Sequence, residues 1–92
     1  MAFRTINKTL TGVAEQFTTT HTPVSWVSIF NVTGNDAVKV GDKNLTATIY
    51  GFSIAAGASS PPIGPLAERS FNLDEIYLLG TSGNVIRVSY LT

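Results

Sequence analysis

The chain has no cysteine, which excludes disulfide bonds and thiolate metal sites. It also has no apolar run near the ~20 residues that a membrane-spanning helix needs. The first residues lack the basic region and the apolar stretch of a signal peptide. We therefore expect a protein that is made in a cytoplasm, has no membrane partner, and folds by packing and hydrogen bonding alone.

Charged residues are scarce, at 13% of the chain against ~25% in an average soluble domain. Six basic and six acidic residues give a net charge of zero. The basic residues are scattered rather than clustered: Arg4, Lys8, Lys39, Lys43, Arg69 and Arg87. Because nucleic-acid binding needs a clustered basic surface, we expect no nucleic-acid partner. A weakly charged surface instead favours contact with other protein subunits.

Groups that support catalysis or metal binding are few and dispersed. The one histidine, His21, stands among threonines in a turn-like segment, whereas a catalytic triad or a zinc site needs several converging groups. The acidic residues are spread along the chain, several at ordinary turn positions: Glu15, Asp36, Asp42, Glu68, Asp74 and Glu75. No phosphate-binding glycine motif occurs. We therefore predict no catalytic residue, no cofactor, no metal site and no enzymatic activity.

Residues that favour extended structure are abundant. Val, Ile and Thr account for 27 of the 92 residues, and these β-branched side chains suit pleated, half-buried surfaces. Turn-forming residues punctuate the chain about every ten residues, which is typical of short strands. The sequence predicts a single all-β domain over residues 1–92, either a small antiparallel β-sandwich or a jelly-roll-like barrel with short strands. Its core is thin at this size, so burial in an oligomer would stabilise it.

The C-terminal segment shows the clearest alternation of apolar and polar residues. Ile86, Val88 and Tyr90 share one parity, which predicts a strand with one face toward the core. A tight-turn sequence at 81–84 separates this strand from an apolar segment at 76–80. We therefore predict a C-terminal hairpin.

A second hairpin is predicted in the middle of the chain. Residues 24–32 are apolar on both faces, which indicates a strand at the centre of its sheet. Turn residues at 33–36 lead to a returning strand at 37–40, in which Val38 and Val40 point inward.

The remaining segments are less regular. Residues 45–54 alternate in polarity and predict a further strand. Residues 55–65 hold three of the four prolines and form a loop that we expect to serve as a contact surface. Residues 2–7 and 12–17 are candidate strands, and residues 1–8 are alternatively an N-terminal arm. No helix longer than one turn is expected.

Nine aromatic residues are distributed over the whole chain: Phe3, Phe17, Trp26, Phe30, Tyr50, Phe52, Phe71, Tyr77 and Tyr90. Most are expected in the core, because each buries ~150–250 Å² when packed. A carbohydrate site or a single-stranded nucleic-acid site would instead group exposed aromatic rings with polar or basic neighbours. Exposure of Trp26, Tyr50 and Tyr77 on one face would distinguish such a binding module.

Four motifs stand in a recognisable order. They are Ile-Phe-Asn-Val-Thr-Gly at 29–34, Ala-Val-Lys-Val-Gly at 37–41, the pair Asn-Leu-Thr-Ala-Thr at 44–48 and Gly-Phe-Ser-Ile-Ala-Ala-Gly at 51–57, and the run from Ile-Tyr-Leu-Leu-Gly to Ile-Arg-Val at 76–88. Over residues 25–90 this order resembles the small β-sandwich proteins of tailed-phage structural gene clusters. That group includes capsid decoration (cement) proteins and head-fibre or tail-associated modules.

The resemblance implies a virion protein, made in the host bacterial cytoplasm, that binds the outer surface of an assembled capsid and stabilises the shell. Its implied partners are the major capsid protein and its own copies, with a homotrimer favoured. The family pattern has no catalytic residues to carry over. The alternative is a tail, connector or fibre-associated module that recognises carbohydrate or a receptor. We expect one or both of the segments 1–8 and 55–65 to contact neighbouring subunits, because their composition is irregular and weakly charged.

Overall fold

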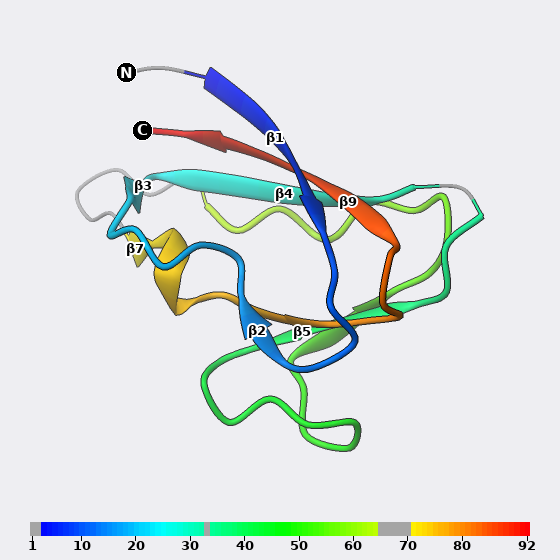
Figure 1. The fold of residues 1–92 in the computed structure, drawn as a ribbon. Helices are drawn as coiled ribbons and strands as arrows, with labels where there is room; N and C mark the ends of the chain where they lie inside the picture. The colour runs from blue at the N-terminus through cyan, green and yellow to red at the C-terminus, as the bar shows by residue number, and fades with distance from the viewer. Residues whose placement is uncertain (1–2, 33, 65–70) are drawn as a thin grey trace.

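The computed structural model describes residues 3–32, 34–64 and 71–92 (Figure 1). Within these ranges the regular secondary structure consists of short strands and one 3-10 turn, which confirms the predicted all-β class. The elements in order are β1 (Phe3–Thr9), β2 (Glu15–Gln16), β3 (Pro23–Val24), β4 (Trp26–Asn31), β5 (Val38–Gly41), β6 (Phe52–Ile54), β7 (Phe71–Asn72), the single 3-10 turn η1 (Leu73–Glu75), β8 (Tyr77–Leu79) and β9 (Val85–Leu91).

Two antiparallel sheets pack against each other as a small β-sandwich. One sheet has the strand order β1-β9-β4, and the other has the order β2-β8-β5-β6. A short pair, β3 with β7, forms a separate antiparallel ladder. In Figure 1 the three-stranded sheet lies above the strands β2 and β5 of the four-stranded sheet.

The core lies between these two sheets. The buried apolar side chains form one cluster: Leu10, Phe17, Val24, Val27, Ile29, Val38, Val40, Ile54, Leu73, Ile76, Leu78, Ile86, Val88 and Tyr90. Burial of one such aliphatic side chain contributes ~1.5–3 kcal/mol. The alternation predicted for the last strand is confirmed, because Ile86, Val88 and Tyr90 are buried and Arg87 is exposed.

The predicted C-terminal hairpin is wrong, although its turn is present. The Asn84 N–H donates to the Thr81 carbonyl at 3.1 Å, but the strands on the two sides of this turn do not pair with each other. β8 pairs with β2 and β5, whereas β9 pairs with β1 and β4. The turn is held at the end of β1, where Leu10 N–H donates to Asn84 O at 2.8 Å and Gly83 N–H donates to Leu10 O at 2.9 Å. These distant contacts direct the chain across the core into the other sheet.

The predicted central hairpin is also wrong, because the two strands that its turn joins do not pair. Its two strands, β4 and β5, belong to opposite sheets, although Val38 and Val40 are buried as predicted. β4 has backbone partners on both sides: β9 on one and the segment 57–63 on the other. Its burial alternates, with Val27 and Ile29 buried and the opposite face half-buried.

The strand predicted over residues 45–54 is confined to its last three residues, β6. Before it, the Thr46 N–H donates to Ile49 O at 2.9 Å and the Thr46 hydroxyl oxygen accepts the Ile49 N–H at 2.9 Å. This local turn occupies backbone groups that a strand would present to a neighbour. Leu45 is buried, whereas Ile49 is 61% exposed.

The proline-rich segment is irregular, but it follows the edge of β4. Val27 and Ile63 exchange backbone hydrogen bonds of 3.0 and 2.9 Å, and the Ser60 N–H donates to Ile29 O at 2.7 Å. The Ser60 hydroxyl also accepts the Ile29 N–H at 2.9 Å. Residues 57–63 therefore cover an edge of the sheet that would otherwise offer unpaired backbone groups.

Candidate interaction surfaces

The N-terminal segment is a strand along residues 3–9, not a loose arm. β1 pairs with β9 over its full length, from Phe3 opposite Leu91 to Thr9 opposite Val85. Within the described part of the chain, no backbone hydrogen bond reaches the other edge of β1. β1 is therefore an open edge strand, and two surfaces depend on it.

The first surface is the outer face of the three-stranded sheet, where residues from β1, β9 and β4 form transverse rows. The strand registers define three rows: Phe3, Leu91 and Trp26; Thr5, Ser89 and Ser28; Asn7, Arg87 and Phe30. We call these nine residues the outer face. One end of it is apolar, its middle carries hydroxyl groups, and its other end carries a cation.

Direct contacts order the side chains of the outer face. The rings of Phe3 and Trp26 lie 6.3 Å apart between centroids and are tilted by 35°. The Thr5 and Ser89 hydroxyl oxygens are 3.0 Å apart. Phe3 remains 64% exposed, the largest exposure among the large apolar side chains described. The apolar row is thus preformed, with Phe3 uncovered and with Trp26 and Leu91 half-buried.

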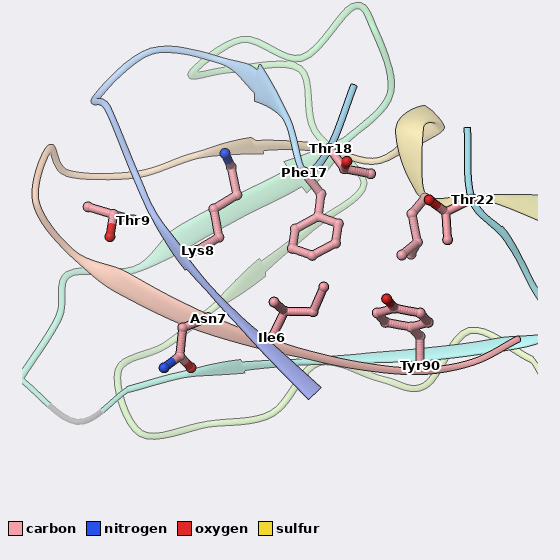
Figure 2. A pocket seen from close by; sticks show the side chains of 9 residues that line it. Ile6, Asn7, Lys8, Thr9, Phe17, Thr18, Thr22 and Tyr90 are labelled. Atoms are coloured by element: carbon pink, nitrogen blue, oxygen red, sulfur yellow. The ribbon is translucent and has the colours of Figure 1, made fainter. Parts of the chain in front are cut away.

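The second surface is a hollow of about 360 Å³ between β1 and the segment 17–22. Figure 2 shows Ile6, Phe17 and Tyr90 around one space, with threonines nearby. Phe17 and Tyr90 are 7% and 6% exposed, so they form the floor, whereas Ile6 on the open strand is 43% exposed. The two sheets do not close over each other on this side.

The aromatic residues singled out from the sequence do not share a face. Trp26 is on β4, Tyr77 is on β8 of the other sheet, and both are half-buried. Tyr50 is 45% exposed in the loop before β6, where the Lys39 ammonium lies 5.1 Å from its ring centroid. The aromatic partner of Trp26 is Phe3. This pair could not be predicted from the sequence, because the register of β1 against β9 depends on contacts between distant segments.

Asp42, Asp74 and Glu75 line one open hollow with Lys43 and Tyr77, and His21 lies beside Asp74. His21 Nδ1 lies 3.8 Å from Asp74 Oδ2, and the His21 side chain is 69% exposed. Among the residues described, no three potential His, Cys, Asp or Glu ligands gather as a metal site would require. Glu68 lies outside the described residues. Three carboxylates fix turns: Glu15 accepts from Thr11, Asp36 from Thr81, and Asp42 from Asn44.

No known protein family, curated protein or solved structure matches the chain. In the part of the chain that the structure describes, no helix has the length and apolar character to cross a membrane. A functional assignment therefore depends on the surfaces themselves, chiefly the outer face and the open edge of β1.

Proposed function

We propose that the protein is a non-enzymatic virion subunit that binds the outer surface of a phage capsid and stabilises the shell as a decoration protein. Its partners are the major capsid protein and further copies of itself, with a homotrimer as the favoured state. The order of motifs over residues 25–90 supports the viral assignment. The observation that carries the binding role is the preformed apolar row of the outer face, in which Phe3 is uncovered.

A weakly charged sheet face suits contact with another protein. Aromatic residues dominate the energetic centres of protein interfaces because they bury large apolar areas with little loss of conformational freedom. Phe3, Trp26 and Leu91 supply such a centre, and the hydroxyl row beside them supplies a polar rim. Affinity at each site is modest and is multiplied by the repeated, symmetric contacts of a shell.

Point substitutions test this proposal better than deletions. Removing residues 1–8 would take away most of β1, and trimming 55–65 would uncover the edge of β4. Either deletion would disturb the fold as well as the contact surface. Exposed side chains can be shortened without that effect.

We expect Phe3→Ala to weaken binding to shells that lack the protein by about tenfold, since truncating a central aromatic residue of an interface costs more than ~1 kcal/mol. Val13→Ala is the matched control, because Val13 is 62% exposed and lies outside the outer face. Co-sedimentation at increasing protein concentration measures the bound copies per shell. Unchanged binding by Phe3→Ala, or an equal loss with Val13→Ala, would show that the outer face is not the contact.

A fibre- or tail-associated module that recognises carbohydrate is the alternative. It is favoured by one observation, the paired rings of Phe3 and Trp26 beside the hydroxyls of Thr5 and Ser89, because rings and hydroxyls can bind the two kinds of surface on a sugar. A glycan array probed with the labelled protein tests it. The copy number per particle separates the two roles: hundreds of copies indicate the shell, whereas six or twelve indicate a tail or connector.

A further inference from the structure

The open edge of β1 also presents side chains that are not part of the outer face. Arg4, Ile6 and Lys8 stand opposite Tyr90, Val88 and Ile86, so the three side chains point toward the inner side of the sheet. Ile6 nevertheless remains 43% exposed, because the hollow lies beneath it. A seven-residue strand edge with an exposed apolar residue at its centre is a site for strand addition.

The charges on this edge indicate which kind of strand can bind there. Within residues 3–32, 34–64 and 71–92 the one ion pair is His21 with Asp74, so neither Arg4 nor Lys8 has a carboxylate partner there. Opposite charges on neighbouring strands stabilise pairing, and like charges oppose it. The edge therefore favours an incoming strand with carboxylates beside Arg4 and Lys8.

A second copy of the chain is a poor occupant. Antiparallel pairing of two β1 strands centred on Ile6 would place Arg4 opposite Lys8 of the partner subunit, twice. Basic residues on an exposed edge are a common barrier to self-pairing. The two basic residues therefore disfavour pairing with a second copy of the chain. They do not explain why the exposed Ile6 lies beside a hollow.

We propose that the free edge of β1 binds an extended segment of another protein with the pattern carboxylate–x–apolar–x–carboxylate, which adds as a further strand. The two carboxylates meet Arg4 and Lys8. The apolar residue between them lies beside Ile6, over the hollow lined by Phe17 and Tyr90. Backbone hydrogen bonds provide the pairing, and the alternating side chains provide the specificity. The pattern is symmetric, so it fits the edge in either direction.

This inference goes beyond the proposed function, because it names a different surface and holds whether or not the partner is a shell protein. The test uses the full chain, labelled with ¹⁵N, and two peptides, Thr-Glu-Thr-Val-Thr-Glu-Thr and Thr-Lys-Thr-Val-Thr-Lys-Thr. NMR titration reports weak binding and locates it. We expect the shifts to centre on β1 and the hollow. The glutamate peptide should bind roughly tenfold tighter at low salt, and the difference should shrink as salt is raised.

Charge reversal makes the test specific. The double variant Arg4→Glu/Lys8→Glu should prefer the lysine peptide, and Arg4→Gln/Lys8→Gln should lose the preference. Lys43→Glu, an exposed change away from β1, should keep it. Absence of shifts in β1, a preference that does not follow these charges, or self-association of the wild-type chain through β1 would overturn the proposal. Failure of shell co-sedimentation alone would bear only on the proposed function.

Discussion

Replacing Asn31 with aspartate is expected to lower the free energy of unfolding by about 3–5 kcal/mol, because the change leaves buried acceptors without donors and buries a charge. Asn31 is 0% exposed at the end of β4. Its side-chain Nδ2 donates to Asp36 O and to Ile54 O, each at 2.9 Å. Its Oδ1 accepts from Asn35 Nδ2 at 2.9 Å.

This amide therefore ties β4 to the following turn and to the end of β6. Asn35 extends the network by donating to Val85 O at 2.6 Å, which adds the start of β9. Aspartate has nearly the shape of asparagine but no N–H group, so Asp36 O and Ile54 O would face a carboxylate oxygen. Since small domains are stable by ~5–15 kcal/mol, a loss of this size removes a large fraction of the total.

Urea denaturation followed by tryptophan fluorescence measures the loss. Asn44→Asp is the control, because Asn44 is exposed in the loop after β5 and a substitution there should change stability by less than ~0.5 kcal/mol. Equal stability of the two variants would show that the Asn31 network contributes little to the fold.

The second large effect is expected at Gly64, where alanine should cost about 3 kcal/mol or more. Gly64 has a φ of +98°, and a Cβ there would meet the Ser25 carbonyl oxygen and, at 3.1 Å, the Trp26 Cα. Both neighbours are backbone atoms at the start of β4, so they cannot turn aside as a flexible side chain would. The positive φ alone costs about 1 kcal/mol for a residue with a Cβ, and the steric overlap adds to it.

Gly34→Ala separates these two contributions. Gly34 has a similar φ of +95°, but nothing lies within 4 Å of a Cβ built there. We therefore expect Gly34→Ala to lose only about 1 kcal/mol in the same urea experiment. Equal losses by both variants would show that the close approach of Gly64 to Ser25 and Trp26 adds nothing to the cost of the positive φ.

The proposed binding surfaces were only partly accessible to sequence reasoning. The low charge and the absence of chemical motifs indicated a protein that acts through its surface, but they did not locate that surface. Phe3 and Trp26 are 23 positions apart in the sequence and meet because both strands pair with β9. The proline-rich segment was expected to contact neighbours, which stays a prediction, whereas the backbone pairing of its residues 57–63 with β4 was not foreseen.

The sequence by itself determined the all-β class and the inward faces of β5 and β9, because a strand has a side-chain period of two and that period is local. Val38, Val40, Ile86 and Val88 are buried as their alternation predicts. Only the tertiary structure decided which strands pair. A turn such as 81–84 suits a hairpin or a crossing between sheets equally well, and hydrogen bonds from the distant Leu10 select the crossing. The same non-local pairing makes β1 an open edge and brings together the outer face.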